Sequence, residues 1–335
     1  MARYDFASDN AAPATPETMA ALAAANSGFA PGYGSDPVCV KAAELIRGWL
    51  DADAQVRFVA SGTAANAISL AALSTPHEAV LAHEHAHILT DEAGAPGLFG
   101  HGVGLIPLPG RSGRIDPAAM AEALAQPDLS FRQSPGALSV TNATEYGAVY
   151  SAAELDSLIG QAKAKGLGVH LDGARLANAA AAGFDVTAIA RLGVDILVIG
   201  GTKAGMTATE AVVVLNPERR RRFDARLKQA GQLPSKARFL AAPFVGMLED
   251  GALVRHAAHA NAMAARLAAG CPFPAVHAVE TNGVFVSMDE PTLKALHAAG
   301  WFAYRFTDGT VRFMCSWATT AEAVDELTAT LKTLA

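Results

Sequence analysis

The sequence has few cysteines, little charge and no long hydrophobic run. Its three cysteines, Cys39, Cys271 and Cys315, are widely spaced and form no CxxC pair, so neither a disulfide framework nor a zinc knuckle is indicated. Charged residues make up 17% and the formal net charge is −6. This charge disfavours nucleic acid as a partner, because a phosphate backbone needs a basic face. No segment approaches the roughly 18 apolar residues of a membrane span, and the first residues lack a signal-peptide pattern. We therefore expect a protein of the reducing cytoplasm that binds neither nucleic acid nor membrane.

What the chain does have is length and apolar content. Its 335 residues, 51% of them hydrophobic, can bury a large core with a smaller domain attached. Short apolar strands alternate with helical patterns over most of the chain, which predicts an α/β fold. After Pro272 and Pro274, expected strands at residues 283–288, 301–306 and 310–314 precede a helix that begins with a capping box at Thr319. This last part predicts a small α/β unit.

A lysine follows one of the predicted strands. The apolar, largely β-branched run over residues 194–199 is typical of a buried parallel strand, which Gly200 and Gly201 end before Lys203. Ligands of open α/β sheets collect beyond the carboxyl ends of strands, so Lys203 lies where chemistry is expected. Taken alone, Lys203 is better explained as a solvated loop residue, because most lysines lie at surfaces.

Two other predicted strands also end in polar residues. Ser61-Gly62-Thr63 follows the strand at residues 55–60 and precedes an alanine-rich helix, a geometry that aims backbone N–H groups at an anion such as phosphate. Ordinary helix capping by Ser61 or Thr63 explains these residues equally well. Asp172 follows the strand at residues 167–171 and needs a cationic partner if buried. The alternative for Asp172 is a structural ion pair with Arg175.

Three histidines alternate along residues 83–87, after a short apolar strand. His83, His85 and His87 allow a metal site, an aromatic stacker with an acid–base group, or loop residues without a role. Metal binding is the weaker of the first two, because no carboxylate or cysteine at a recognisable spacing completes a ligand set. We therefore predict no metal site.

The strand ends together indicate one cofactor. Asp172 and Lys203 are 31 residues apart (203 minus 172), about one helix-plus-strand unit. A phosphate anchor, a carboxylate for the pyridinium nitrogen and an amine for covalent attachment are what pyridoxal 5'-phosphate (PLP) requires. At about 4 Å and an effective dielectric constant near 20, the carboxylate–pyridinium attraction is roughly 4 kcal/mol. That attraction keeps the ring nitrogen protonated, and a protonated ring is a strong electron sink.

These residues resemble the low-specificity L-threonine aldolases, which belong to the β-eliminating lyases of the aspartate-aminotransferase-like fold. The resemblance covers nearly the whole chain. Its landmarks, in order, are Ser8-Asp9, the motif at 33–37 (Tyr-Gly-Ser-Asp-Pro), Ser61-Gly62-Thr63, Ala86-His87 with Glu92-Ala93-Gly94, the motif at 170–176 (His-Leu-Asp-Gly-Ala-Arg-Leu) and Gly200-Gly201-Thr202-Lys203. The resemblance implies a three-layer, mostly parallel sheet in a large PLP-binding domain, 1–245, and a small C-terminal domain, 246–335.

The resemblance also implies how PLP is held. Lys203 forms the covalent link and Asp172 pairs with the pyridinium. The phosphate lies at Ser61, Gly62 and Thr63, next to Thr202, and His87 stacks on the ring. Lys228 falls where the family places a lysine contributed to the neighbouring subunit's site, so we expect a homodimer, usually within a tetramer.

For the substrate, the resemblance implies a carboxylate clamp and a retro-aldol reaction. Ser8 and Arg312 match the carboxylate-binding groups, Arg175 matches the arginine near the cofactor's phenolic oxygen, and Tyr33 lies at a helix entrance. L-Threonine, L-allo-threonine and related β-hydroxy-α-amino acids would give glycine and an aldehyde. The family's commoner pattern has a second histidine within the segment that here is Thr141 to Tyr146, and this chain has none there. The base for the β-hydroxyl proton is therefore open between His85, His87, Glu92 and a water molecule.

Other functions stay open from the sequence. An aminotransferase or another β-eliminating lyase would use the same lysine and aspartate, and only the products would distinguish it. A metal-dependent hydrolase would use His83, His85 and His87. A binding protein that kept the fold without activity is the remaining alternative.

Overall fold

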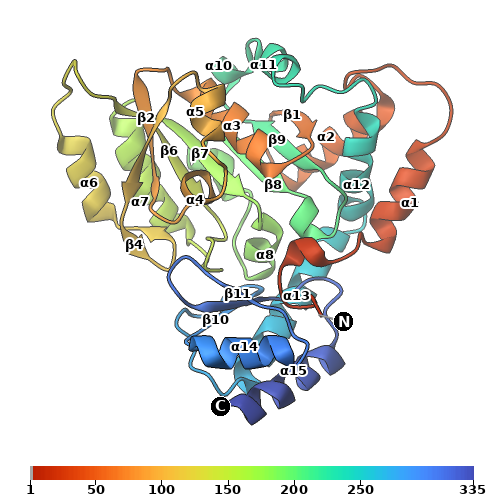
Figure 1. Cartoon of the computed structure of the whole chain (residues 1–335). Coiled ribbons are helices and arrows are strands. Elements are labelled where there is room, and N and C mark those ends of the chain that lie inside the picture. The colour runs from red at the N-terminus through yellow and green to blue at the C-terminus, as the bar shows by residue number, and fades with distance from the viewer. Residues whose placement is uncertain (1–2) are drawn as a thin grey trace.

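Two sheets of different size organise the molecule (Figure 1). The computed structural model describes residues 3–335. A seven-stranded sheet forms the upper part in Figure 1 and a three-stranded sheet the lower part. Within the described residues, no helix is both long and apolar enough to cross a membrane.

The large sheet is mostly parallel, as predicted. Its strands, in spatial order, are β1 (Gln55–Val59), β9 (Glu210–Val214), β8 (Ile196–Gly200), β7 (Gly168–Gly173), β6 (Ser134–Thr141), β2 (Glu78–His83) and β3 (Gly104–Leu108). Only β9 runs antiparallel to its neighbours, and the other pairs in the sheet are parallel. Every residue of β7, β8 and β9 is buried, as expected for strands covered on both faces.

Helices cover both faces of this sheet, which makes three layers. Successive residues of β8 alternate between two apolar clusters: Leu197 and Ile199 belong to one, Ile196 and Val198 to the other. The first cluster contains residues of α2 (Pro37–Leu50), α7 (Ala152–Ala164), α8 (Leu176–Ala181) and α12 (Arg238–Leu248). The second contains residues of α3 (Gly62–Leu73) and α11 (Phe223–Gln229).

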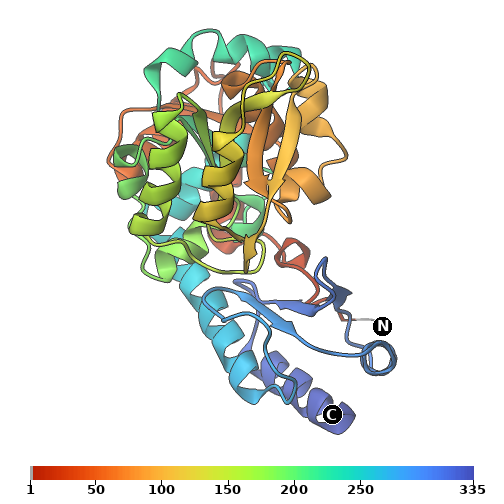
Figure 2. The ribbon, with the colours of Figure 1, turned by 90° about the vertical axis from the view of Figure 1, so that its left-hand side faces the viewer.

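The lower part is a small α/β unit built on its own apolar cluster. Its sheet has the order β10 (Gly283–Val286), β12 (Val311–Met314), β11 (Tyr304–Arg305), and it packs with α14 (Glu290–Ala298) and α15 (Ala321–Leu334). Helix α13 (Ala252–Gly270) runs from the upper part to the lower part (Figure 2). Leu253 of this helix belongs to the core of the large sheet, and Leu267 to the core of the small unit. The domain limits at 245 and 246 stay a prediction, and these two residues lie within α12.

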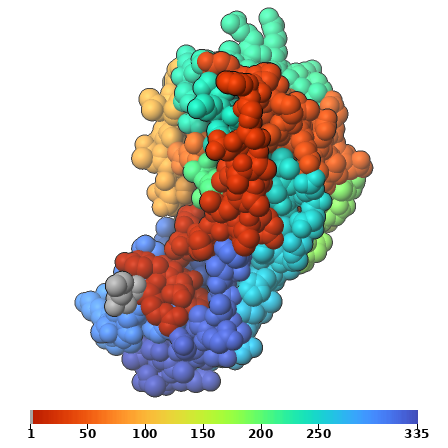
Figure 3. All heavy atoms as spheres, turned by 90° about the vertical axis from the view of Figure 1, so that its right-hand side faces the viewer, coloured from red at the N-terminus to blue at the C-terminus, as the bar shows by residue number. Residues whose placement is uncertain are grey.

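The N-terminal arm packs on the small unit before it reaches the large one. The side chain of Phe6 belongs to the small unit's core, and its carbonyl accepts a hydrogen bond from the Met314 N–H at 2.8 Å. After η1 (Asp9–Ala11), helix α1 (Pro16–Ala25) continues upward beside α12 (Figure 3). The arm therefore joins the two parts near the carboxyl edge of the large sheet.

The strand predicted at residues 301–306 is shorter than expected. Only Tyr304–Arg305 pairs with the small sheet. The preceding residues bond to the arm instead, since the Phe302 N–H donates to the Arg3 carbonyl at 2.9 Å and Trp301 forms a parallel bridge with Arg3. The arm lies far away in sequence, so a local pattern could not predict this pairing.

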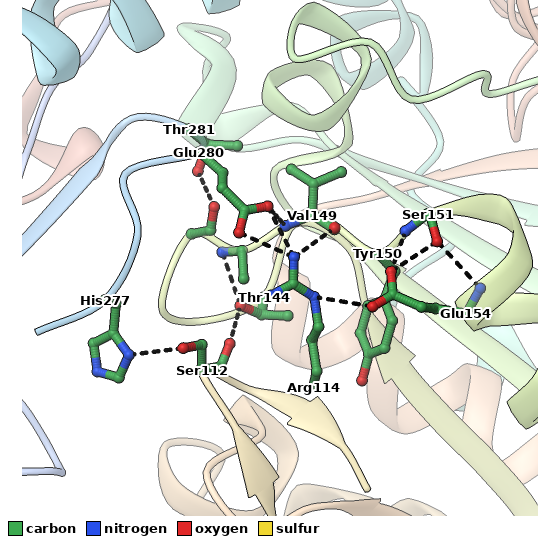
Figure 4. A network of polar contacts seen from close by, with 12 residues as sticks. Ser112, Arg114, Thr144, Val149, Tyr150, Ser151, Glu154, His277, Glu280 and Thr281 are labelled. Carbon is green, nitrogen blue, oxygen red and sulfur yellow. Dashed lines mark hydrogen bonds and ion pairs between the residues drawn. The ribbon is translucent and has the colours of Figure 1, made fainter. Parts of the chain in front are cut away.

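A polar network also connects the two parts (Figure 4). The Arg114 guanidinium donates to both carboxylate oxygens of Glu280, at 2.9 and 3.0 Å, and to the Val149 carbonyl at 2.8 Å. Ser112 is hydrogen-bonded to His277 at 2.9 Å. The network links the hairpin of β4 (Gly110–Arg111) and β5 (Arg114–Ile115) and the loop after β6 to the segment before β10.

The remaining elements are α4 (His87–Thr90), α5 (Ala95–Phe99), α6 (Pro117–Ala125), α9 (Ala188–Arg191), η2 (Thr202–Ala204) and α10 (Pro217–Arg220).

Candidate active site

A cavity of about 320 Å³ lies at the carboxyl ends of four strands of the large sheet. Residues directly after β1 and β8, and the final residues of β6 and β7, line it together with Asn10 from the arm. This is the edge where open α/β sheets bind ligands, and the volume is within the range of small-molecule sites. The predicted site residues that line the cavity are Ser61, Gly62, Thr63, His87, Asp172, Arg175, Thr202 and Lys203.

The N-terminus of α3 forms one wall of the cavity. Ser61 is the N-cap, with extended backbone, and its hydroxyl accepts a hydrogen bond from the Ala64 N–H at 3.3 Å. The N–H groups of Gly62 and Thr63 belong to the first turn, which has no carbonyl partners of its own within the helix. These N–H groups and the helix dipole make this wall suited to an anion such as phosphate.

Lys203 follows a sharp backbone turn at the end of β8. Gly200 and Gly201 form this turn, and a Cβ atom at Gly200 would collide with the Ala174 carbonyl and one at Gly201 with the Thr209 carbonyl. Glycine is required at both positions because the backbones approach so closely. The turn delivers Lys203, in the short helix η2, to the cavity wall.

Asp172 is fixed by two N–H donors and has no ion pair with Arg175. The carboxylate is 4% exposed. Its Oδ1 accepts from the Ala174 N–H at 2.9 Å, and its Oδ2 accepts from the side-chain amide of Asn66 at 2.9 Å. These hydrogen bonds hold the carboxylate at the cavity wall. The alternative of an Asp172–Arg175 structural pair is wrong, because Arg175 binds a different aspartate.

That aspartate is Asp9 of the arm. Arg175 Nε and Nη2 donate to the two oxygens of Asp9 at 2.7 and 2.9 Å, and both side chains are nearly buried. Burial alone would raise the pKa of Asp9, but the Arg175 guanidinium holds that pKa below its usual range. Asn282 adds a third donor at 3.1 Å. The arm therefore holds Arg175 in place at the cavity.

A chain of hydrogen bonds leads from Asp172 to His87. Asn66 donates to Asp172 and also to Glu92 Oε1, at 2.9 Å. The same Glu92 oxygen is 2.9 Å from His87 Nδ1, and this hydrogen bond raises the pKa of His87. Glu92 is buried and lies behind His87, outside the cavity lining. It orients the His87 ring.

Arg312 is a partly buried cation that forms no ion pair with an acidic side chain within residues 3–335. Its Nε atom is buried and has no hydrogen-bond partner within residues 3–335, and its guanidinium lies 5.0 Å from the centre of the Phe306 ring. Burial, and then the nearby charge of Arg175, lower the pKa of Arg312. Withdrawing a charge from water without a counterion is costly, so this partly buried arginine is suited to an anionic ligand. Ser8 directly precedes Asp9 in the arm. Its hydroxyl accepts a hydrogen bond from the Asn10 N–H at 3.2 Å.

Six of the predicted residues are not among those that line the cavity: Ser8, Tyr33, His85, Glu92, Lys228 and Arg312. His85 Nδ1 is hydrogen-bonded to the Tyr146 hydroxyl at 2.5 Å. Tyr33 and Lys228 contact each other, with the Lys228 ammonium 4.6 Å from the centre of the Tyr33 ring, and both are exposed. Tyr33 and Lys228 therefore do not reach the cavity of their own chain.

The three histidines of residues 83–87 do not converge on one point. His83 Nε2 is near the Gly110 carbonyl, whereas His85 and His87 have the Tyr146 and Glu92 partners described above. In the described part of the chain, no group of three or more histidine, cysteine, aspartate or glutamate residues is arranged to hold a metal ion. Each of the three imidazoles is hydrogen-bonded to a different neighbour, and the absence of a metal site stays a prediction.

Sequence reasoning missed three acidic or amide side chains at the cavity. Asn66, Glu145 and Glu210 line it, and burial raises the pKa of both glutamates. Asn66 is a single amide in an otherwise apolar stretch of α3, and Glu210 directly precedes an apolar strand. Isolated polar residues in buried elements were the signal that could have found Asn66 and Glu210, whereas Glu145 follows the carboxyl end of β6.

The residues present fit PLP. The α3 N-terminus offers donors for a phosphate, Asp172 offers a fixed carboxylate, and Lys203 offers an amine in the same cavity. Asn66 Oδ1, Glu145 Oε2 and Arg312 Nε are buried polar atoms without partners among the described residues. Such atoms are expected where a bound molecule supplies the missing hydrogen bonds. The individual residue roles stay predictions.

Comparisons with known proteins agree with this fit. The model of the family described as β-eliminating lyase matches residues 5–291. A low specificity L-threonine aldolase of a Pseudomonas species is 43% identical over 339 residues, covering 98% of this chain and 96% of that protein. The protein of the same name in Pseudomonas aeruginosa is also 43% identical, over 96% and 95%. Among solved structures, the threonine aldolase of Leishmania major superposes with a TM-score of 0.93 at 32% identity, covering 99% of each chain.

Proposed function

The chain belongs to the β-eliminating lyase family, and from that membership we propose that it cleaves L-threonine, L-allo-threonine and related β-hydroxy-α-amino acids to glycine and an aldehyde. It is a PLP-dependent carbon–carbon lyase of the threonine aldolase type. The observation that carries this function is the convergence of Lys203, Asp172 and the α3 N-terminus on one cavity.

PLP supplies an electron sink conjugated with the substrate Cα, which stabilises the negative charge left when the Cα–Cβ bond breaks. Lys203 is the amine to which PLP is attached. Asp172 keeps the ring nitrogen protonated, and Ser61, Gly62, Thr63 and Thr202 hold the phosphate. His87, oriented by Glu92, would stack on the ring of bound PLP. Arg175, fixed by Asp9, would bind near the cofactor's phenolic oxygen.

Arg312 and Ser8 bind the substrate carboxylate. Within the described residues the Arg312 guanidinium has no acidic partner and its Nε has no hydrogen bond, so a substrate carboxylate would supply the missing counterion. Holding the carboxylate would fix the orientation of the substrate, and with it the direction of the Cα–Cβ bond that breaks. Tyr33 belongs to the substrate-binding residues as well, in the assembly described next.

We place the protein in the cytoplasm as a homodimer that pairs into a tetramer. Tyr33 and Lys228 support the dimer, because they contact each other on the surface, away from the cavity of their own chain, and can complete a neighbour's site. Mixing inactive Lys203→Ala with inactive Lys228→Ala subunits tests this assembly. Shared sites predict partial recovery of activity in the mixture, and independent sites predict none.

The function is tested by the products. Purified protein supplied with PLP and L-threonine should release glycine and acetaldehyde in equal amounts, and Lys203→Ala should release neither. A keto acid in place of glycine would indicate an aminotransferase. Loss of activity with a metal chelator would indicate a hydrolase.

A further inference from the structure

Glu145 presents one fixed and one free carboxyl oxygen at the cavity. It lies in the loop after β6. Its Oε1 accepts hydrogen bonds from the His87 backbone N–H at 3.1 Å and from the Thr141 hydroxyl at 3.0 Å. Its Oε2 is buried and has no hydrogen-bond partner within residues 3–335. The carboxyl group is therefore held by one oxygen, while the other is buried at this lining residue without a hydrogen-bond partner of its own.

The surroundings of Glu145 make it a weaker acid than an ordinary glutamate. Burial raises its pKa, the nearby charge of Asp172 raises it further, and the hydrogen bonds from its own backbone, His87 and Thr141 offset only part of this. The other titratable groups that interact with Glu145 are Arg175, Tyr146 and Tyr150. A carboxylate with a raised pKa is a stronger base than usual, which suits proton transfer near neutral pH.

The other acid–base groups near the cavity are already engaged. Nδ1 of His87 is hydrogen-bonded to Glu92, and this hydrogen bond raises the pKa of His87. His85 and Glu92 do not line the cavity.

Glu210 does line the cavity but lies on another side of it. It pairs with Val59 at the end of β1, next to the α3 N-terminus, and its Oε2 accepts from the Gly201 N–H at 2.6 Å. It is therefore adjacent to the proposed phosphate position. Glu145 lies beyond β6, near His87 and away from that wall.

We propose that Glu145 is the base that removes the β-hydroxyl proton of the substrate. This role rests on the proposed aldolase function. The hydroxyl O–H bond breaks and its proton moves to Glu145 Oε2, while the oxygen electron pair forms the C=O bond of the aldehyde. The electron pair of the Cα–Cβ bond stays on Cα, which then takes up a proton to give glycine. Glu145 releases its proton to solvent and returns to the carboxylate, so that charge and protons balance over the cycle.

The test uses Glu145→Gln in the PLP-loaded enzyme, with exposed Glu122→Gln as the matched control. Glutamine keeps an oxygen for the His87 and Thr141 hydrogen bonds but cannot accept a proton. We expect kcat for L-threonine to fall by about 100-fold or more, and the acidic limb of its pH profile to disappear. Exchange of the glycine α-hydrogen with deuterated solvent needs no β-hydroxyl base and should stay nearly unchanged. Glu122→Gln should behave as the wild type.

An infrared titration gives a readout independent of activity. The difference between wild type and Glu145→Gln should contain a carboxyl band that titrates above the range of ordinary glutamates. Equal loss of glycine exchange and threonine cleavage would show a merely structural role and overturn the proposal, as would retained cleavage with an unchanged acidic limb. A wild type that yields no glycine and aldehyde would instead contradict the proposed aldolase function itself.

Discussion

At the scale of single residues, Asn66 links the two carboxylates on which the site depends. Its side-chain nitrogen donates to Asp172 and to Glu92 at 2.9 Å each. With both amide hydrogens used, its orientation is determined, because the reverse assignment would place a carbonyl oxygen against two carboxylates. Asn66 thus couples the position of Asp172 to the position of the His87 ring.

Replacing Asp172 by asparagine removes a charge while nearly preserving shape. We expect kcat for L-threonine to fall by about 10²- to 10³-fold, because the carboxylate–pyridinium attraction is worth roughly 4 kcal/mol at an effective dielectric constant near 20. Steady-state kinetics measure the effect. Asp195→Asn is the matched control, since Asp195 is equally buried but binds Lys163 and the Val169 N–H outside the cavity. It should lower the melting temperature without lowering kcat, and normal turnover by Asp172→Asn would contradict the role of Asp172.

The His87–Glu92 pair predicts a pH dependence of stability. Because Glu92 raises the pKa of His87, the protonated histidine stabilises the folded state. This contribution is complete below the ordinary histidine pKa of about 6.5 and is lost as the pH rises through the pKa of His87. Glu92→Gln should lower the pKa of His87, as measured by NMR of the imidazole ring. It should also weaken stability more at about pH 5.5 than at about pH 8.5. An unchanged His87 titration would contradict the pairing.

At the scale of elements, the carboxyl ends of β1, β7 and β8 bring together residues that are far apart in sequence. Each strand delivers one component: Ser61 to Thr63 after β1, Asp172 near the end of β7, and Lys203 after β8. A rigid sheet therefore fixes the distances between the anion site, the carboxylate and the amine.

Helix α3 gives a prediction with an internal control. Ser61→Ala removes the N-cap hydroxyl, so we expect about 1 kcal/mol lower stability and weaker PLP binding, because the first turn also forms the anion site. Ser151→Ala removes the corresponding cap of α7, whose capping box lies outside the cavity. It should cost similar stability with unchanged PLP affinity. Urea unfolding and fluorescence titration with PLP measure the two quantities, and equal PLP affinity in both variants would argue against the α3 site.

The sequence could predict these strand ends because buried strands and glycine turns have local patterns. The run before Gly200 and the motif around Asp172 are examples. The antiparallel direction of β9 could also have been predicted, since the nine residues 201–209 are too few for a parallel crossover. The partner of Arg175 was not, because Asp9 is 166 residues away and nothing local links the two.

At the scale of the whole molecule, the site depends on contacts between the arm, the large sheet and the small unit. Asp9 of the arm binds Arg175 of the large part and Asn282 of the small unit. The Arg114–Glu280 network makes a second connection, beside the loop that carries Thr144 (Figure 4). Arg312 comes from the small sheet. The substrate side of the site therefore requires the large part and the small unit to be held in a fixed position relative to each other.

Removing the Asp9 side chain should strongly weaken the connection between the large part and the small unit. Asp9→Ala leaves the Arg175 guanidinium buried without its partner, so we expect a loss of about 3–5 kcal/mol in the free energy of unfolding. The exposed Arg266–Asp325 pair provides the control, and Asp325→Ala should leave the free energy of unfolding nearly unchanged, because solvent screens this pair. Urea unfolding measures both. A loss for Asp9→Ala as small as the control would contradict the proposed function of the arm.

Covalent attachment of PLP to Lys203 is the central claim, and borohydride reduction tests it most directly. Reduction of the PLP-loaded protein makes the link permanent, and peptide mapping by mass spectrometry then locates it. We predict one modified peptide, carrying the pyridoxyl group on Lys203, and none in Lys203→Ala. A modification at another lysine in an enzyme that cleaves threonine, or cleavage without any modification, would contradict the account.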